Sequence, residues 1–189
     1  MRAIICGAGI AGLTVAQRLT EFGWQVTVVE KAPGPRAQGY MMDFFGLGYD
    51  VADRIGVLPR LEELGYVVEE VSYFNARGRR VAGLSFANFA RGAGGRLLSI
   101  MRPDLELALR ELVADRVELR YGCSVSEIHD GPDDVQVTLT DGSVHDADLL
   151  VGADGIHSRI REMTFGSERK FLRYLGFHTA AYTFQDPVV

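Results

Sequence analysis

The pattern Gly7-x-Gly9-x-x-Gly12 is the first group of residues in the sequence that indicates a chemistry. A short apolar run, residues 3–6, precedes it, and a helical pattern follows it. In such a strand–turn–helix the first glycine allows a tight turn, the second lets a pyrophosphate approach the backbone, and the third lets helix and strand pack closely. The N-terminus of the helix offers free N–H groups and a positive dipole end to phosphate oxygens. The spacing therefore predicts a dinucleotide site.

Glu30 is the second candidate, because it ends the next apolar run, 18 positions beyond Gly12. A carboxylate at this point can accept hydrogen bonds from both hydroxyls of an adenosine ribose. It disfavours a 2′-phosphate, which argues against NADP at this site. The alternative is an ordinary α/β turn followed by an unrelated glutamate. We favour the dinucleotide site because strand, glycine turn, helix and acid all occur within the first thirty residues.

A second small-residue turn, Gly152-Ala153-Asp154-Gly155, follows the apolar run 149–151 and precedes a short basic helix. Ligands of open α/β sheets bind outside the carboxyl ends of the strands, where this turn would lie. Asp154 would then present a carboxylate to a ligand that crosses that edge. The periodicity supports an alternative equally well, in which Asp154 only caps the helix that begins near Ser158.

Hydrophobic patterns predict the elements that must position these motifs. The first thirty residues form a β-α-β unit, and a longer apolar stripe follows Pro103, a residue suited to the first turn of a helix. Asp141-Gly142 is typical of a two-residue hairpin turn. The expected strands are 3–6, 25–29, 69–75, 80–86, 97–101, 117–120, 124–129, 135–140, 143–147 and 149–151; the expected helices are 11–22, 49–55, 58–64, 103–113 and 158–162; residues 87–96 are expected to be a mobile loop and 176–184 a new extended segment.

Composition excludes several classes of protein. The chain has 189 residues, 47% of them hydrophobic, and a net charge of −5, which excludes wholesale disorder and argues against a nucleic-acid-binding protein. No apolar run reaches the roughly 18 residues of a membrane span, and glycines interrupt the only stretch that resembles a secretory signal. The two cysteines make neither a disulfide framework nor a zinc site. We therefore expect a soluble, cytoplasmic protein without a metal and without a nucleic-acid or membrane partner.

The order of four segments resembles the group A flavoprotein monooxygenases, the aromatic or polyketide hydroxylase type. These segments are the glycine motif, Glu30-Lys31, Arg102-Pro103-Asp104-Leu105 and Gly152-Ala153-Asp154-Gly155, and the resemblance runs to about Phe184. It implies FAD in an extended conformation, NADPH or NADH as a transient co-substrate, and O2. The implied reaction is the hydroxylation of an aromatic or polycyclic, polyketide-like small molecule.

The resemblance also implies roles for individual residues. The cofactor carries the chemistry in such enzymes, so we nominate no catalytic acid or base. For Arg102 the alternative is a surface arginine paired with Asp104. Aromatic and methionine residues such as Phe44 and Tyr73 line either a substrate cavity or simply the core. The implied sites are Gly7, Gly9, Ile10, Ala11 and Gly12 for the FAD pyrophosphate, Glu30 and Lys31 for the adenosine ribose, Arg102 for the flavin phosphate or ribityl chain, Val125 for the adenine through its backbone, Asp154 and Gly155 beside the pyrophosphate and the docking nicotinamide nucleotide, and Arg36 and Gly39 beside the flavin.

The sequence departs from the family at one important point. The family binds the ribityl chain and diphosphate with a second, Gly-Asp segment in its C-terminal half, and no Gly-Asp occurs in this chain. We therefore expect the N-terminal part of a larger flavoprotein, which needs its C-terminal half or a partner chain.

The expected fold is α/β: a Rossmann-like FAD-binding domain with a parallel sheet, an inserted β-meander and the beginning of a substrate-binding β-sheet. Residues 1–70 and 97–170 would form the FAD-binding domain, and residues 71–96 and 171–189 partial substrate-domain elements. A non-catalytic FAD- or nucleotide-binding module remains the alternative function. An NAD-dependent dehydrogenase lacks a matching catalytic set, and a flavin halogenase would need a tryptophan signature that the single Trp24 cannot supply.

Overall fold

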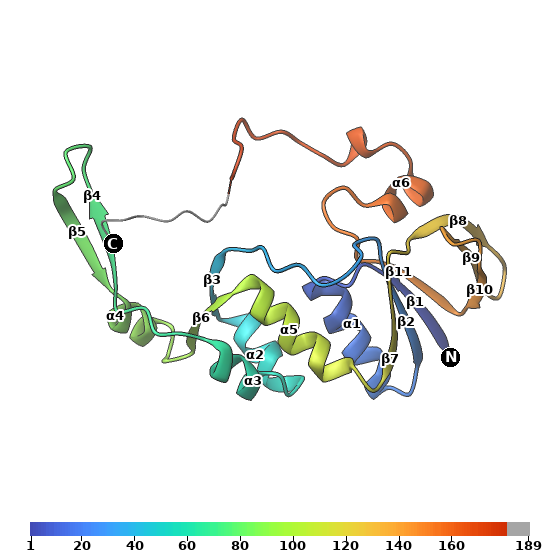
Figure 1. The fold of residues 1–189 in the computed structure, drawn as a ribbon, viewed down its shortest axis with the longest axis horizontal. Coiled ribbons are helices and arrows are strands. Elements are labelled where there is room, and N and C mark those ends of the chain that lie inside the picture. Colours follow the sequence, from blue (N-terminus) through green and yellow to red (C-terminus); the bar gives the residue numbers. More distant parts are fainter. Residues whose placement is uncertain (181–189) are drawn as a thin grey trace. The chain divides into compact units, whose positions relative to one another are not determined.

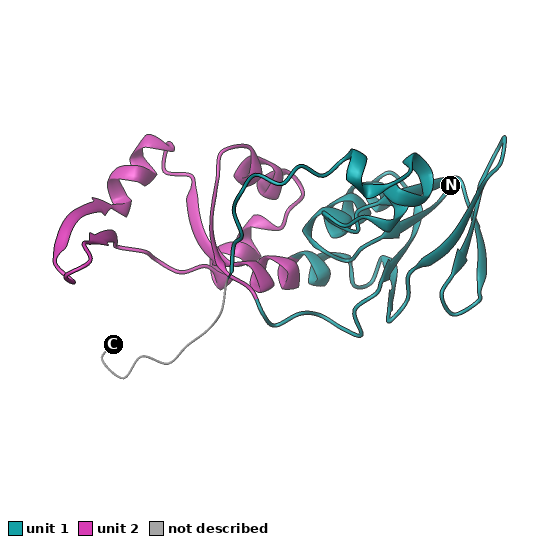
Figure 2. Cartoon of the chain, turned by 90° about the horizontal axis from the view of Figure 1, so that it is seen from above, with its two compact units in different colours: residues 1–38, 109–189 teal, residues 39–108 magenta. Residues whose placement is uncertain are grey.

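The computed structural model describes residues 1–180 and divides into two compact units, which we describe separately (Figure 1; Figure 2). The first unit comprises residues 1–38 and 109–189, and the second comprises residues 39–108. The assignment of residues 71–96 and 171–189 to a substrate domain stays a prediction.

A four-stranded parallel sheet forms the centre of the first unit, with the strand order β11-β1-β2-β7 (Figure 1). Strand β1 pairs with a neighbour on each side, so that Ile4 lies opposite Thr27 of β2 and Leu150 of β11. All of these pairings are parallel, so the strands end at one common edge. The strands are β1 (Arg2–Cys6), β2 (Gln25–Glu30), β7 (Val117–Tyr121) and β11 (Leu149–Gly152). The expected return of residues 149–151 to the parallel sheet is confirmed.

Both faces of this sheet are covered, which explains why its central strands β1 and β2 carry apolar side chains on both faces. Successive side chains of a strand point to opposite faces. Ala3 and Ile5 of β1 accordingly belong to the core beneath helix α1 (Ile10–Glu21). Ile4 and Cys6 belong to a second core beneath three antiparallel strands. The first unit is therefore a three-layer structure of helix, parallel sheet and antiparallel sheet.

The three antiparallel strands form the expected meander, in the order β10-β9-β8. They are β8 (Val125–Asp130), β9 (Val135–Leu139) and β10 (Val144–Ala147). The expected two-residue turn at Asp141-Gly142 is wrong by one residue. The Leu139 N–H donates to the Ser143 carbonyl at 2.9 Å, which leaves a three-residue connection, residues 140–142, with Gly142 at φ +85°. A left-handed glycine at the last loop position is typical of such three-residue hairpins.

The chain leaves β11 through a turn into helix α6 (Arg159–Phe165) and a short 3-10 helix, Glu168–Lys170. The helix expected over 158–162 is thus confirmed and extends further. Residues 176–180 contain no regular secondary structure, and the rest of the extended segment expected over 176–184 lies outside the described residues.

The second unit contains two antiparallel pairs of strands, β3–β6 and β4–β5. The hairpin expected over 69–75 and 80–86, the helices near 49–55 and 58–64 and the strand 97–101 are confirmed. Strand β3 was not expected, because its Met- and Phe-rich sequence has no clear alternation and it is held by pairing with the distant β6. The elements are β3 (Met41–Phe45), α2 (Leu47–Arg54), α3 (Leu58–Leu64), β4 (Glu70–Phe74), β5 (Arg80–Ser85), α4 (Phe86–Gly92), β6 (Leu97–Met101) and the start of α5 (Arg102–Val113).

The expectation of a mobile loop over residues 87–96 is wrong. Helix α4 occupies most of this segment, and the glycines that suggested a loop end it. Gly94 and Gly95 both have positive φ, +68° and +78°, and follow the last helical turn. Glycines in this conformation are the usual residues just beyond a helix C-terminus.

None of the helices in residues 1–180 combines the length and apolar character of a membrane span.

Candidate functional site

The glycine motif lies in the turn between β1 and α1, where the backbone approaches itself closely. Gly7 has φ +111° and its N–H donates to the Val29 carbonyl at 2.7 Å. A Cβ on Gly7 would lie 2.4 Å from the Ala153 carbonyl oxygen, and one on Gly12 would lie 1.9 Å from the carbonyl oxygen of Gly7. Both contacts are with backbone atoms, so a side chain at either position would displace the loop. The expected need for glycine at these two positions is therefore confirmed, because neither position has room for a Cβ atom.

The N-terminus of α1 is open. Gly9 is its N-cap residue, no side chain caps it, and its first turn contains no acidic residue. The Leu13 N–H bonds to the Gly9 carbonyl at 3.0 Å. The N–H groups of the residues before Leu13 therefore have no acceptor within the helix. Helix α1 has twelve residues, an uncapped N-terminus and no carboxylate in its first turn. Such a helix end suits a phosphate group, because its free N–H groups and positive dipole end face the negative charge.

Glu30 ends β2 beside this turn and is half-buried. Its Oε2 accepts a hydrogen bond from the Ala8 N–H at 3.0 Å, and its Oε1 accepts one from the Ala32 N–H at 2.9 Å. Each carboxylate oxygen has a further lone pair, so two ribose hydroxyls can still donate to it. The carboxylate thus orders the turn after β1 and the loop after β2, and it keeps capacity for the ligand that the sequence predicts.

The second motif lies beside the first. The Ala153 N–H donates to the Cys6 carbonyl at 2.8 Å, which continues the pairing of β11 with β1 into the turn. This contact brings Ala153 against Gly7 and joins two motifs that are far apart in the sequence. The glycine turn, Glu30 and residues 152–155 therefore lie together at the carboxyl ends of the parallel strands, within one compact unit.

Asp154 caps helix α6. Its Oδ1 accepts from the Ser158 hydroxyl at 2.5 Å, and its Oδ2 accepts from the N–H groups of Arg159 at 2.6 Å and Ile160 at 3.2 Å. Of the two alternatives for Asp154, the structure thus supports helix capping. The role of Asp154 and Gly155 beside the cofactor stays a prediction. The cap also occupies the N-terminus of α6, so that of the helices α1 and α6 only α1 offers an open end.

Replacing Asp154 by alanine is expected to destabilise the first unit by about 2 kcal/mol, because three donors lose a charged acceptor. Thermal or urea unfolding followed by circular dichroism would measure the change. Asp133→Ala, on the exposed loop after β8, is the matched control and should change stability by less than about 0.5 kcal/mol. Equal stability of the two variants would contradict the capping role.

Two further predicted residues of the first unit, Lys31 and Val125, differ in accessibility. Lys31 is exposed beside Glu30. The Val125 side chain is fully buried in the core beneath the meander, and its N–H bonds to the Cys6 sulfur. Burial raises the pKa of the Cys6 thiol, and the Asp154 and Glu30 carboxylates add to this effect. Cys6 therefore remains protonated and acts as a core residue; the contact of Val125 with adenine stays a prediction.

Gly39 and Arg102 belong to the second unit, and Arg36 is an exposed residue of the first. A Cβ on Gly39 would lie 2.4 Å from Cδ of Pro103, so Gly39 allows the close approach of these two segments. Arg102 donates from Nη1 to the Glu106 carboxylate at 3.0 Å. The alternative that paired Arg102 with Asp104 is therefore wrong: one helical turn along the chain, at i+4, Glu106 is the better-placed partner. The proposed contacts of all three residues with FAD remain predictions.

Sequence reasoning missed the backbone partners of the site, Ala8, Ala32 and Ala153. The N–H groups of Ala8 and Ala32 hold the Glu30 carboxylate, and the Ala153 carbonyl lies where a Cβ on Gly7 would be. The only signal in the sequence was their small size next to glycine or glutamate.

In residues 1–180 no group of three or more His, Cys, Asp or Glu side chains is arranged to hold a metal ion.

The residues present fit the ADP portion of a dinucleotide. An open helix N-terminus would take the pyrophosphate, the glycines remove the side chains that would block its approach, and Glu30 would accept the ribose hydroxyls.

Comparison with known proteins agrees with this fit. The family model described as "FAD binding domain" matches residues 1–187. An FAD-dependent monooxygenase of Sarocladium schorii, asL4, is 31% identical over 100% of this chain and 45% of its own length. A Mycobacterium tuberculosis protein, Rv1260, is 35% identical over 95% of this chain and 49% of its own length. The crystal structure of Klebsiella pneumoniae HpxO complexed with FAD and uric acid matches with a TM-score of 0.73 and 28% identity, over 86% of this chain and 41% of that one. The chain thus spans about half the length of the curated relatives it matches.

Proposed function

Because this chain belongs to the family of FAD-dependent monooxygenases, through its FAD binding domain, we propose that it forms the N-terminal, FAD-binding part of an enzyme that hydroxylates an aromatic or polycyclic small molecule. The observation that carries the proposal is the meeting of the glycine turn, the open α1 N-terminus and Glu30 at one edge of the parallel sheet.

The roles of this chain's own residues follow from their geometry. The N–H groups of residues 10–12 would donate to the pyrophosphate of FAD, and the positive end of α1 would stabilise its charge. Glu30 would orient the adenosine ribose, while its bonds to Ala8 and Ala32 hold the carboxylate in place. Asp154, through its cap on α6, would keep the turn of residues 152–155 against Gly7. FAD, when bound, supplies the transfer of one oxygen atom from O2 to the substrate.

The substrate class and the reductant are two further proposals; a structural relative supports the first, and the resemblance of the motifs implies the second. One structural relative, HpxO, was crystallised with uric acid, a fused-ring heteroaromatic compound. An aromatic or polycyclic substrate for this protein agrees with that name and with the resemblance of the motifs. NADH or NADPH would serve as the reductant, and it would bind elsewhere than at the Glu30 site. We propose a cytoplasmic location, where both reductants are available.

The remaining half of the flavoprotein belongs to the same proposal. The relatives extend well beyond the matched part, and residues 1–189 contain no Gly-Asp segment. We propose that the segment completing the flavin site comes from that other half or from a partner chain.

The test of the proposed function separates the two ends of the cofactor. FAD titrated into the purified chain, followed by quenching of flavin fluorescence, is expected to bind. ADP should compete with FAD, whereas FMN, which lacks the adenosine, should not. ADP that carries a 2′-phosphate should bind at least about tenfold more weakly than ADP, because Glu30 would face a second negative charge. Competition by FMN but not by ADP would refute the assignment of this edge.

A further inference from the structure

The antiparallel pair β3–β6 in the second unit has one covered and one open face. Residues that lie opposite each other in such a pair share a face, and successive residues alternate between the faces. Ile100 is fully buried and marks the covered face. On the other face Met41 lies opposite Met101, and Phe45 lies opposite Leu97. Met41 and Phe45 are 45% and 48% exposed, so this second face, which we call the β3–β6 face, is apolar and open.

The β3–β6 face continues onto helix α4 through aromatic contacts. The rings of Phe45 and Phe89 meet edge to face, with their centroids 5.7 Å apart, and the ring of Phe86 lies 6.4 Å beyond Phe89. Phe89 is itself 39% exposed. Contiguous exposed apolar side chains often mark a binding surface. Aromatic rings in this arrangement can pack against a further ring.

A carboxylate lies in the middle of this face. Asp43 is exposed between Met41 and Phe45, and its Oδ1 accepts a hydrogen bond at 2.8 Å from the hydroxyl of Ser99, which is buried. A carboxylate has about four acceptor positions, so Asp43 keeps capacity for a further donor. An apolar group that covered the face would bury this charge, which is costly unless the same molecule supplies a donor. The occupant must therefore combine an apolar surface with an N–H or O–H group.

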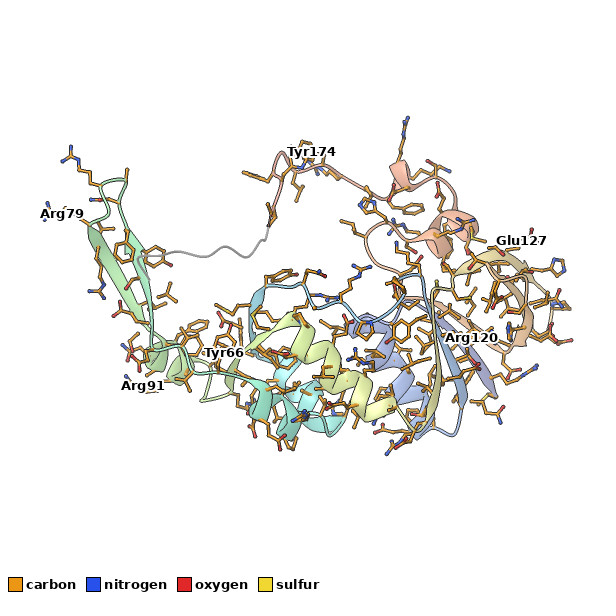
Figure 3. All side chains as sticks on the ribbon, in the orientation of Figure 1. Tyr66, Arg79, Arg91, Arg120, Glu127 and Tyr174 are labelled. Atoms are coloured by element: carbon orange, nitrogen blue, oxygen red, sulfur yellow. The ribbon has the colours of Figure 1, made fainter. Side chains whose placement is uncertain are left out.

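Tyr66 adds a hydroxyl group to the same face. The residue, labelled in Figure 3, donates from its N–H to the Ser99 carbonyl at 2.9 Å and from its hydroxyl to the Met101 sulfur at 3.8 Å. Burial raises the pKa of the Tyr66 phenol, and the Asp43 and Asp104 carboxylates add to this effect. The phenol therefore stays protonated, and the negative charge on this face belongs to carboxylates.

One end of the face adjoins residues that the resemblance places at the flavin. The Arg102 N–H donates to the Tyr40 carbonyl at 3.0 Å, directly beyond the pair of Met41 and Met101. Gly39 lies against Pro103 at the same end. A molecule on the β3–β6 face would therefore lie next to the residues that are predicted to contact the reactive part of the cofactor.

We propose that the β3–β6 face binds the aromatic substrate and that Asp43 determines its specificity. The favoured substrate carries a phenolic O–H or a ring N–H, which donates to the Asp43 carboxylate while its rings pack on Met41, Phe45 and Phe89. An aromatic carboxylate is disfavoured, because its charge would face that of Asp43. This inference rests on the proposed function, since it names the substrate class of the same enzyme.

The experiment compares three probes with the same two rings: 2-naphthol, 2-methoxynaphthalene and 2-naphthoate. Each is titrated into the purified chain, with and without FAD, and binding is followed by ligand-observed NMR. 2-Naphthol is expected to bind about tenfold more tightly than 2-methoxynaphthalene, because it donates a hydrogen bond to a charged acceptor. 2-Naphthoate should bind about tenfold more weakly than 2-methoxynaphthalene.

Asp43→Asn removes the charge and keeps an acceptor for Ser99. This variant should bind 2-naphthol about fivefold more weakly and 2-naphthoate about tenfold more tightly than the original protein. Loss of folding cannot produce a gain in affinity, so the second change identifies the charge. Asp53→Asn, at an exposed position of α2 in the same unit, is the matched control and should change neither affinity by more than about twofold.

A second pair of variants tests the apolar part of the face. Phe45→Ala should weaken all three probes by a similar factor of about five or more, because each loses the same ring contact. Phe74→Ala, at an exposed position of β4, should leave all three unchanged.

Several outcomes would overturn the inference. These are equal binding of 2-naphthol and 2-methoxynaphthalene, tighter binding of 2-naphthoate, a preference that Asp43→Asn leaves unchanged, and no binding of any probe. A chain that binds FAD but shows no preference for the donor refutes this inference alone. A chain that shows the Asp43-dependent preference but binds no FAD refutes the proposed function, and the face then binds aromatic donors for another purpose.

Discussion

Replacing Gly12 by alanine is expected to abolish measurable FAD binding and to destabilise the protein by about 3 kcal/mol or more. The new methyl group would lie 1.9 Å from the Gly7 carbonyl oxygen and 3.4 Å from Cβ of Ala153. Neither the carbonyl nor the turn after β11 can move without breaking the contact between the two motifs. The loop would open, and the N–H groups of α1 would lose the position that suits a pyrophosphate.

Urea unfolding and FAD titration would measure the two effects of Gly12→Ala separately. Gly34→Ala is the matched control, because a Cβ on Gly34 meets nothing within 4 Å and its φ is not positive. This control should retain the FAD affinity and stability of the original protein. If Gly12→Ala bound FAD as well as Gly34→Ala does, the close contact would have no part in the site.

The second large effect is expected at Glu30. Glu30→Gln should lower the affinity for FAD about 100-fold, which corresponds to about 3 kcal/mol. The carboxylate would accept two ribose hydroxyls, and hydrogen bonds to a charged group contribute about 1.5–3 kcal/mol each. Glutamine preserves the size of the side chain, but its NH2 group faces one of the two N–H donors, Ala8 or Ala32, that now bond to the carboxylate.

The affinity of Glu30→Gln for FAD should be compared with that of Glu127→Gln. Glu127 is an exposed residue of β8, labelled in Figure 3. The substitution Glu127→Gln removes the same charge from the same unit as Glu30→Gln does. Its substitution should leave FAD affinity within about twofold, since an exposed charge at a distance is screened by salt. Glu30→Gln should also discriminate less strongly than the original protein between ADP and ADP that carries a 2′-phosphate. Unchanged FAD affinity in Glu30→Gln would remove Glu30 from the site.

Much of the first unit could be predicted from the sequence because its signals are local. An apolar strand, three glycines at fixed spacing, an amphipathic helix and a second strand within thirty residues define the β-α-β unit. The same holds for the meander, whose alternating residues mark its buried face. Pattern reasoning was less successful in the second unit, where β3 depends on its partner β6 and glycines after α4 suggested a loop instead of a helix end.

The sequence by itself therefore determined which residues would form a dinucleotide site and which family they resemble, because the phosphate-binding turn is a local pattern with a local physical reason. Only the tertiary structure decided how the site is held together. It places Ala153 against Gly7, directs the Asp154 carboxylate into the N-terminus of α6, leaves the N-terminus of α1 open, and exposes the uncharged edge of β11. The contact of Ala153 with Gly7 joins segments that are more than a hundred residues apart, and the uncharged edge depends on which strand lies last in the sheet, so no local pattern encodes these two features. The cap of Asp154 on α6 is local, and for it the structure only selected one of the two alternatives that the sequence offered.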